Sequence, residues 1–294
     1  MITASENDTL RGFLRQVYVP SRLDLSSGAI EQLAVTIRLI ERWAGSELSV
    51  YDLTEDLVRR FLADYRKGRA AATVNSKRCQ LLALWQAAYD EELIDRPPRR
   101  KKVRKAVAQP EIPEAWTPSE VAAILESSQQ DPGPIAGICA ADWWQSLLLV
   151  IFDSGERRGA VLNSAEPRDL SMDGAWIVFR KTKSKAPRWC RLHPDTVKAC
   201  RQIYDPARQF LWPWPYSREA LEKRFRKILK RAGVRYGRGK GGLFHKMRRT
   251  SGTLVEAAGG DGAKHLGNTR AVFERHYRDP RFFSSDLERL PRPK

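Results

Sequence analysis

A basic, proline-containing break near residue 100 constrains the fold of this chain of 294 residues more than any other feature. The stretch from 96 to 105 reads RPPRRKKVRK and holds seven basic residues and no acid. Its paired prolines prevent a helix from continuing, because proline lacks the backbone donor and restricts the residue before it. A chain of this length also favours two domains. We therefore predict a first domain over residues 1–95, a basic linker over 96–115 and a second domain over 116–294.

The first domain is expected to be helical throughout. Residues 9–93 place apolar side chains at helical spacing in four successive segments, which predicts a four-helix domain. In the fourth segment, the apolar stripe that includes Leu82 and Trp85 is expected in the core. The polar start of this segment either lies against DNA or is the solvated end of a core helix. On the first interpretation it contacts DNA through Thr73, Asn75, Lys77 and Arg78.

The second domain is expected to be mixed α/β, mostly helical with a small antiparallel β-sheet. Thr117 and Glu120 have the spacing of a capping box, with proline at the first helical position. Residues 175–180 and 188–194 are rich in β-branched and aromatic side chains and are joined by turn residues, which predicts a β-hairpin. Lys183 lies at the bend of this hairpin. A lysine on such a loop is usually only solvated, so its position alone indicates little.

Positive charge is concentrated in parts of the chain. The formal net charge is +17, from 52 Lys+Arg against 35 Asp+Glu, and residues 223–249 hold twelve basic residues and no acid. Clustered charge of this kind predicts a polyanionic partner. Double-stranded DNA is the first expectation, and a membrane surface is the weaker alternative. A nuclear-localisation tract is the rival interpretation of the basic linker.

The composition also argues against several classes of protein. No apolar run reaches the roughly 18–20 residues of a spanning helix, and the N-terminus lacks the features of a secretory signal. We therefore expect an intracellular, cytoplasmic protein. The four cysteines form no CxxC pair and the four histidines complete no zinc spacing. The cysteines are expected to be reduced and structural, and no metal or cofactor is predicted.

The stretch from 245 to 277 carries the residues best suited to phosphate chemistry. His245 and Arg248 are three positions apart at the start of an amphipathic segment, so on a helix they project from one face and could hold one anion. Tyr277 follows on a second helix-compatible segment, nine positions after Asn268. A chain reversal between the two segments would bring the phenol to that anion.

Four short motifs in chain order make this sequence resemble the tyrosine recombinase (phage integrase) family. Residues 154–157, SGER, resemble the turn that carries the first catalytic arginine, and residues 182–183, TK, resemble the hairpin that carries the lysine. Residues 245–248, HKMR, resemble the H-x-x-R box. Residues 266–268, LGN, followed nine positions later by Tyr277, resemble the box that precedes the nucleophile. The resemblance covers nearly the whole chain.

The sequence departs from the family pattern at two positions. The acidic residue often found three positions after the first arginine is Ala160 here, and the final histidine of the family is Asn268. An asparagine amide can still donate a hydrogen bond to a phosphate oxygen, although it carries no positive charge. His265 lies three residues before Asn268 and could replace the missing histidine, but a structural or DNA-backbone role is the preferred interpretation.

The resemblance implies a helical, SAM-like core-binding domain followed by a catalytic domain that cleaves and rejoins DNA. The expected reaction needs neither metal nor ATP and passes through a covalent 3'-phosphotyrosyl intermediate. Two arginines would hold the phosphate oxygens, a histidine would take the phenol proton or bond the phosphate, a lysine would protonate the 5' oxygen, and an asparagine would add one donor. The resemblance assigns these roles to Arg157, Lys183, His245, Arg248, Asn268 and the nucleophile Tyr277.

Basic residues of the linker and of the 223–249 stretch are expected to contact the DNA. The family also implies a homotetramer on two DNA sites, in a prokaryotic, nucleoid-associated setting. The C-terminal tail carries Phe282, Phe283 and Leu287, an apolar patch that would pack on a neighbouring protomer or fold back on its own domain. The expected DNA contacts are Arg99, Arg100, Lys101, Lys102, Arg235, Arg238, Lys240 and Arg249.

Three other functions remain open from the sequence. The first is a DNA-binding protein of the same fold whose catalysis is weakened by Ala160 and Asn268. The second is a type IB topoisomerase, which shares the chemistry but relaxes supercoils without strand exchange. A metal nuclease is the third, and it would need a cluster of carboxylates that the 223–249 stretch does not contain.

Overall fold

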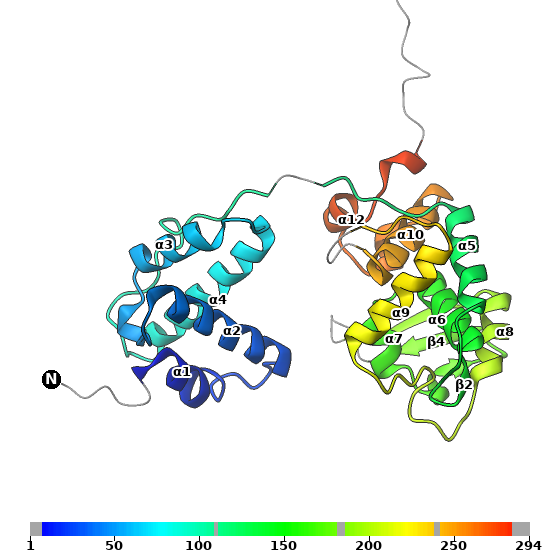
Figure 1. Ribbon diagram of the computed structural model, residues 1–294, viewed down its shortest axis with the longest axis horizontal. Coiled ribbons are helices and arrows are strands. Elements are labelled where there is room, and N and C mark those ends of the chain that lie inside the picture. Colours follow the sequence, from blue (N-terminus) through cyan, green and yellow to red (C-terminus); the bar gives the residue numbers. More distant parts are fainter. Residues whose placement is uncertain (1–7, 109–110, 181–185, 238–241, 284–294) are drawn as a thin grey trace, which may run out of the picture. The chain divides into compact units, whose positions relative to one another are not determined.

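The chain divides by its internal contacts into two compact units, Met1–Pro110 and Glu111–Lys294. Each unit has its own hydrophobic core. No helix among the described residues is long and apolar enough to span a membrane. The computed structural model (Figure 1) describes residues 8–108, 111–180, 186–237 and 242–283.

The first unit is a helical bundle, as the sequence predicts. Helix α3 begins because the hydroxyl of Thr54 accepts the Leu57 N–H at 3.1 Å, and α2 ends at Gly45, whose φ of 77° favours glycine. Both helices pack against α4 and bury apolar side chains between them. The helical elements are α1 (Leu10–Phe13), a π-helical turn (Leu14–Tyr18), α2 (Ser27–Ala44), a 3-10 turn (Val50–Asp52), α3 (Glu55–Tyr65) and α4 (Ala71–Asp90).

The basic segment after α4 is anchored to the first unit over much of its length. Arg78 donates from Nη2 to the Arg100 carbonyl at 2.9 Å and from Nε to the Val103 carbonyl at 2.5 Å. Val103 is 1% exposed and belongs to the core of this unit. The Asn75 amide bonds both the carbonyl and the N–H of Ala106, each at 2.8 Å. The stretch expected as a linker therefore begins as an ordered part of the first unit.

The second unit is mostly helical, with two small antiparallel sheets. Its first helix begins at the predicted capping box, in which the Thr117 N–H donates to Glu120 at 2.8 Å and the Glu120 N–H donates back at 3.2 Å. The helices are α5 (Pro118–Gln129), α6 (Ala140–Ser154), α7 (Arg158–Ser164), α8 (Pro194–Ile203), α9 (Arg218–Arg231), α10 (Phe244–Ala257), α11 (Gly262–Leu266) and α12 (Arg270–His276).

The predicted hairpin is confirmed and gains a third strand. Strands β4 (Trp176–Phe179) and β5 (Arg188–Arg191) pair antiparallel, and β3 (Leu170–Ser171) pairs with β4 on its other side. A separate two-stranded ribbon, β1 (Pro134–Ile135) with β2 (Ile138–Cys139), was not anticipated from the sequence. Strands this short carry too little periodic pattern to stand out from a loop.

Helix α6 lies at the centre of the second unit (Figure 1), where it packs against α5, α8 and α10. Trp143, Trp144 and Leu147 on this helix are fully buried. Because α6 is enclosed on several sides, its C-terminal end is fixed relative to α10. That end carries the first of the predicted catalytic motifs.

Candidate active site

The turn between α6 and α7 requires a glycine for two reasons. Gly155 ends α6 with a φ of 58°, the left-handed conformation that side chains with a Cβ rarely adopt. A Cβ at this position would also overlap the Leu266 side chain and lie 3.0 Å from Nε2 of His265. The close approach brings the end of α11 against the turn. Glu156 and Arg157 follow directly.

Arg157 sits at the N-cap of α7 and remains accessible. Its side chain is 37% exposed, and Nη1 lies 4.0 Å from Oε1 of Glu156. Its backbone N–H donates to that same carboxylate oxygen at 2.8 Å. The main chain of Arg157 is therefore fixed while most of its guanidinium donors stay available to a ligand.

Arg248, on α10, is buried and links two distant turns. Its side chain is 1% exposed, and Nη1 donates to the Gly155 carbonyl while Nη2 donates to the Leu266 carbonyl at 2.5 Å. Within the described part of the chain, its Nε has no hydrogen-bond partner. A buried donor without a partner is costly, so the Nε–H of Arg248 is available to donate a hydrogen bond to an oxygen of an anionic ligand.

His245 and Tyr277 lie together over this arginine. Their ring centroids are 5.2 Å apart, and the Arg248 guanidinium is 5.4 Å from the Tyr277 ring centroid. Tyr277 follows α12 directly and is 6% exposed. Its carbonyl accepts the Thr253 hydroxyl at 2.7 Å, so α10 holds the backbone of the tyrosine. The two segments of the 245–277 stretch thus meet at this arginine, through a chain reversal that their spacing permits.

The environment of His245 keeps its imidazole neutral. Burial lowers its pKa from 6.5 to about 4, and the positive charges of Arg249, Arg248 and Arg157 act in the same direction. A neutral imidazole has a free nitrogen lone pair at pH 7. It can therefore accept a proton or a hydrogen bond.

Asn268 and His265 occupy different places near the end of α11. Nδ2 of Asn268 is buried and has no hydrogen-bond partner among the described residues. Nε2 of His265 instead lies 2.7 Å from the Ser251 hydroxyl, and its carbonyl accepts a hydrogen bond from Arg188. His265 is therefore tied into the protein, while the Asn268 amide keeps an unused donor.

Two residues that the sequence did not single out as functional complete the cluster. Glu156 is 2% exposed, and its Oε2 accepts Nη1 of Arg188, on β5, at 2.7 Å. Arg188 also donates from Nη2 to the Ser154 carbonyl at 2.8 Å. The sequence signal for Glu156 was its place beside Arg157, the predicted catalytic arginine, in a chain that has Ala160 where the family often has an acid. Arg188 carries no comparable signal.

Some predicted positions lie outside the described residues. Lys183 is one, although the last pair of the hairpin, Phe179 with Arg188, brackets its loop. The predicted DNA contacts Arg238 and Lys240 are two more, and Leu287 of the tail is another.

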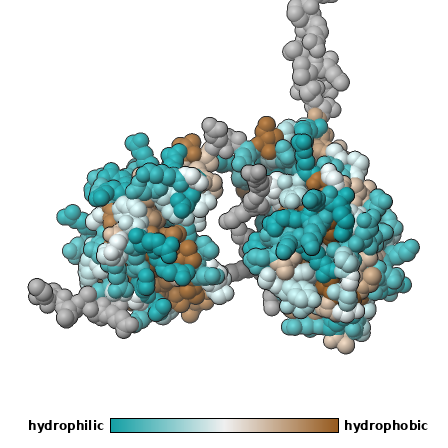
Figure 2. Space-filling view, viewed as in Figure 1, coloured by the Kyte–Doolittle hydropathy of each residue, from teal (hydrophilic) through white to brown (hydrophobic). Residues whose placement is uncertain are grey.

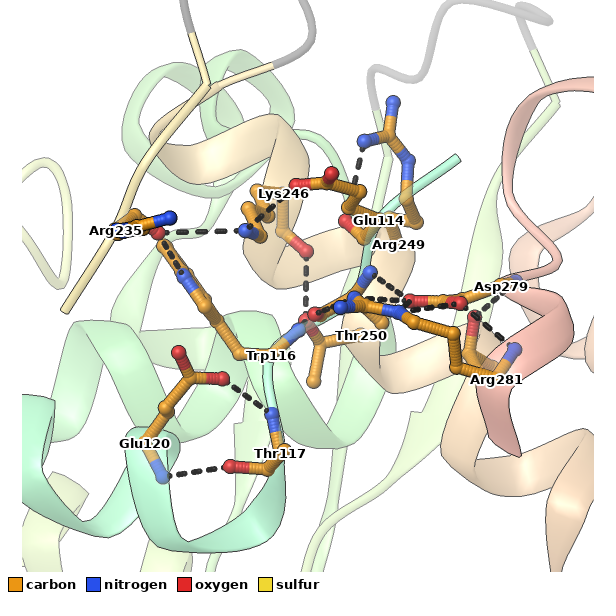
Figure 3. Close-up of polar contacts among 12 residues, drawn as sticks. Glu114, Trp116, Thr117, Glu120, Arg235, Lys246, Arg249, Thr250, Asp279 and Arg281 are labelled. Carbon is orange, nitrogen blue, oxygen red and sulfur yellow. Dashed lines mark hydrogen bonds and ion pairs between the residues drawn. The ribbon is translucent and has the colours of Figure 1, made fainter. Parts of the chain in front are cut away.

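The segment that enters the second unit lies beside the segment that follows Tyr277 (Figure 3). The Ala115 N–H donates to Oδ2 of Asp279 at 2.7 Å, and the Arg281 guanidinium donates both to Asp279 and to the Ala115 carbonyl. Asp279 is fully buried. Burial raises the pKa of its carboxyl, but hydrogen bonds from Arg281 and from the Ala115 N–H outweigh this, so the pKa is below its usual value. We call this the Ala115–Asp279 junction.

Helix α10 supports the junction from one side. The Trp116 N–H donates to the Thr250 hydroxyl at 2.8 Å, and Lys246 lies 3.7 Å from a Glu114 carboxylate oxygen (Figure 3). Arg249 donates to the His276 carbonyl at 3.1 Å and to the Glu114 carbonyl at 3.2 Å. This arginine, predicted as a DNA contact, is thus engaged within the protein.

The predicted DNA contacts of the first unit fall into two groups. Lys77 and Arg78 are 5% and 6% exposed, and Lys77 donates to the Thr36 hydroxyl at 3.0 Å. Their charges serve the fold of this unit, as does the Asn75 amide. Exposed positions remain for a ligand at Thr73, Arg100, Lys101 and Lys102, with Arg235 in the second unit. Arg99 is also exposed, but its Nε pairs with Glu55 at 2.7 Å.

Helix α9 carries much of the basic 223–249 stretch on its outer face. It buries Leu221, Phe225, Ile228 and Leu229 and exposes lysines and arginines on the opposite side. Figure 2 shows a broad hydrophilic surface over this helix on the face turned to the viewer. The helix therefore presents positive charge outward while its apolar face fixes it to the core.

No protein-family model matches this chain, and no curated protein matches it by sequence. Solved structures match over nearly its whole length. A lambda integrase tetramer bound to a Holliday junction is similar with a TM-score of 0.71 and 19% identity, covering 96% of this chain and 81% of that chain. A lambda integrase dimer bound to a COC' core site gives 0.70 and 18%, covering 95% and 98%.

The Tn1549 transposon integrase in complex with a circular intermediate DNA is similar with a TM-score of 0.67 and 15% identity, covering 96% of this chain and 100% of that chain. At these identities the likeness establishes architecture. It agrees with the helical bundle, with the mostly helical second unit, and with the expectation drawn from the four motifs. The fold of this chain is that of the tyrosine recombinases.

Proposed function

We propose that this protein is a site-specific DNA recombinase that cleaves and rejoins DNA through a covalent 3'-phosphotyrosyl intermediate on Tyr277. The observation that carries the proposal is the meeting of His245, Arg248 and Tyr277, with ring centroids 5.2 Å apart and the guanidinium 5.4 Å from the phenol ring. Positive charge, a proton acceptor and a nucleophile are what phosphoryl transfer to a phenol requires.

The arginines would stabilise the charge that develops on the phosphate. Arg157 offers a partly exposed guanidinium, and Arg248 offers the unpartnered Nε from the interior. Arginine suits this task because its planar donors match the geometry of phosphate oxygens. The unpartnered Nδ2 of Asn268 supplies a further donor of the same kind. Removing one such donor typically slows catalysis by about 10²–10³-fold.

Proton transfer completes the reaction. The Tyr277 oxygen attacks phosphorus, the bond to the 5' oxygen breaks, and the neutral His245 takes the phenol proton. We assign protonation of the departing 5' oxygen to Lys183, on the sequence motif alone. Each general acid–base role is worth about 10²–10⁴-fold. Because the phosphotyrosyl bond conserves the energy of the broken bond, rejoining needs no nucleotide cofactor.

We also propose that the protein acts on double-stranded DNA as a homotetramer. The basic outer face of α9 and the exposed residues 99–102 would contact the phosphate backbone, each contact adding salt-dependent affinity. The solved lambda integrase is a tetramer on a Holliday junction, and another is a dimer on a core site. Within the start of the tail, Arg278 lies over the Phe283 ring at 3.8 Å, and Arg281 donates to the Ala115 carbonyl of the same unit at 3.1 Å.

Tyr277→Phe tests the nucleophile. The change keeps the ring and removes the attacking oxygen, so we expect DNA affinity within about twofold of wild type and complete loss of covalent adducts. Nicked duplexes drawn from the DNA that flanks the gene would be incubated with protein, and SDS-resistant protein–DNA adducts counted. Tyr216→Phe is the matched control, because Tyr216 is 56% exposed and packs on Trp214. Adducts at wild-type level with Tyr277→Phe would remove Tyr277 as nucleophile.

The same assay separates the alternatives. Binding without adducts by the wild-type protein would indicate a DNA-binding protein of this fold. Adducts accompanied by relaxation of supercoiled plasmid, without joining of two sites, would indicate a topoisomerase. Cleavage that stops in EDTA would indicate a metal nuclease.

A further inference from the structure

We propose that Glu156 is a positioning residue for the phosphate-binding arginines, a role that rests on the proposed function. Its carboxylate lies at the turn between α6 and α7 and is 2% exposed. It reaches three arginines that come from three different elements of the second unit. Burying a charged carboxylate costs free energy unless positive charges or hydrogen-bond donors lie beside it.

The two carboxylate oxygens have separate partners. Oε2 accepts Nη1 of Arg188 at 2.7 Å. Oε1 accepts the backbone N–H of Arg157 at 2.8 Å and lies 3.9 Å from Nη1 of Arg248. One side chain therefore fixes the main chain of the exposed arginine and the charge of the buried one.

The buried arginines also close a ring of contacts around the same turn. Arg188 donates to the carbonyls of Ser154 and His265, and Arg248 donates to the carbonyls of Gly155 and Leu266. Both guanidiniums thus bridge the end of α6 to the end of α11. Carbonyl oxygens satisfy their donors but supply no negative charge, so the two cations and Arg157 would repel one another without Glu156.

Glu156 is the carboxylate within ion-pair distance of both Arg188 and Arg248 in the described part of the chain. One helical turn away, position 160 is an alanine that is 8% exposed, so no acid is offered from the next turn of α7. The neutralising charge of the cluster therefore comes from residue 156. Because the Glu156 side chain is 2% exposed, we place it behind the arginines and out of direct contact with a ligand's phosphate.

This arrangement predicts an effect on the reaction step and not on DNA affinity. Without the charge of Glu156, the side chain of Arg248 would no longer be held where its Nε faces the ligand. The proposed contacts of α9 and residues 99–102 with the DNA backbone would be unaffected. The loss should therefore appear in the rate of phosphoryl transfer from bound DNA.

Glu156→Gln tests the proposal, because glutamine keeps the size and one acceptor oxygen but removes the charge. We expect single-turnover adduct formation to slow about 10- to 100-fold, the usual scale for residues that orient a site's ligands. The dissociation constant for the same DNA should stay within about twofold. Glu41→Gln is the matched control: it removes a 5%-exposed carboxylate that pairs with Arg11 in the first unit, and it should leave the rate unchanged.

A neutral methylphosphonate at the scissile position distinguishes positioning from general damage. This substrate has one fewer charged oxygen for the arginines to hold, so the ratio of wild-type to Glu156→Gln rates should shrink towards one. A ratio that stays the same on both substrates would overturn the proposal. So would a normal rate on natural DNA, or an affinity loss as large as the rate loss.

A second variant and the wild-type adduct assay complete the test. If Glu156→Gln loses its thermal unfolding transition, Glu156→Asp replaces it, since aspartate keeps the charge one methylene farther from the arginines. A slower rate at unchanged affinity supports the proposal, and an unchanged rate overturns it. Absence of adducts with the wild-type protein would overturn the proposed function and this inference together, whereas wild-type adducts with a normal Glu156→Gln rate overturn the inference alone.

Discussion

The turn after α6 and the start of α10 each contribute one arginine. One of the two side chains is partly exposed and the other is buried. Arg157 is 37% exposed and makes one distant ion-pair contact, at 4.0 Å. Arg248 is 1% exposed and bonds two carbonyls from separate turns. Both arginines are expected to hold the same phosphate. Arg248 also links two turns of the second unit through its hydrogen bonds to their carbonyls.

The difference shows two ways in which a fold can place an arginine charge. An exposed arginine costs little to maintain but must be ordered by the ligand when it binds. A buried arginine is ordered in advance, and the protein satisfies it with carbonyls and a carboxylate. A change at Arg248 should therefore lower both the stability and the activity of the protein. A change at Arg157 should lower the activity and leave the stability nearly unchanged.

The largest expected effect tests that coupling directly. Arg248→Ala leaves two buried carbonyls without their donor and removes one of the cations within ion-pair distance of the buried Glu156 carboxylate, so the free energy of unfolding should fall by about 3–5 kcal/mol. Arg157→Ala should change it by no more than about 1 kcal/mol. Urea unfolding of the two variants beside the wild type measures both values, and both variants should lose adduct formation.

Equal loss of stability in the two variants would contradict the claim that Arg248 stabilises the fold more than Arg157 does. Full stability in Arg248→Ala would show that its carbonyl contacts contribute nothing net. Adduct formation by either variant at the wild-type rate would remove that arginine from the phosphate site.

A smaller effect concerns the pH dependence set by His245. Its pKa in the folded protein is about 4, below the ordinary 6.5, with burial as the first cause and neighbouring arginines as the next. Stability from this group is therefore present above pH 6.5 and is lost as the pH falls towards 4, where the unfolded chain takes up a proton that the folded chain refuses. Wild type should lose more stability between pH 7 and pH 5 than His245→Gln.

Thermal unfolding at the two pH values measures this difference. His265, whose pKa burial also lowers to about 4, contributes a similar dependence that persists in both proteins. Arg157→Ala should raise the pKa of His245 slightly, because burial outweighs the arginine charges. An NMR titration that returned the ordinary value of 6.5 in this variant would mean that charge, and not burial, dominates.

The smallest expected effect is at Asn268. Its Nδ2 is a buried donor without a partner in the described chain, and histidine at this place would offer a donor with partial positive charge. We expect Asn268→His to form adducts at least as fast as the wild type, with little change in stability. A large drop in rate with the unfolding transition intact would show that the asparagine has another task.

Much of the fold could be predicted from local sequence patterns. The capping box at Thr117 and the pairing of β4 with β5 follow from neighbouring residues, and the structure confirms both. The meeting of His245 with Tyr277 required a chain reversal that the spacing only permitted. The family resemblance, and not periodicity, made that reversal a definite expectation.

Long-range partners explain what the sequence could not give. Lys77 and Arg78 fell on the polar start of α4, but Arg78 reaches carbonyls 22 and 25 residues later in the chain. Glu156 finds Arg188 at a separation of 32 residues. A charged residue and a distant backbone carbonyl leave no joint mark in a single sequence, so such contacts emerge only when the chain is folded.

The Ala115–Asp279 junction has a consequence for truncation. The beginning and the end of the second unit's described chain are joined there by a 2.7 Å hydrogen bond, two residues beyond Tyr277. Shortening the unit from its N-terminal side past Ala115 would strip a partner from the buried Asp279 charge and loosen the turn that follows the tyrosine. A truncation near residue 115 would thus disturb the backbone around Tyr277, 162 positions later in the sequence.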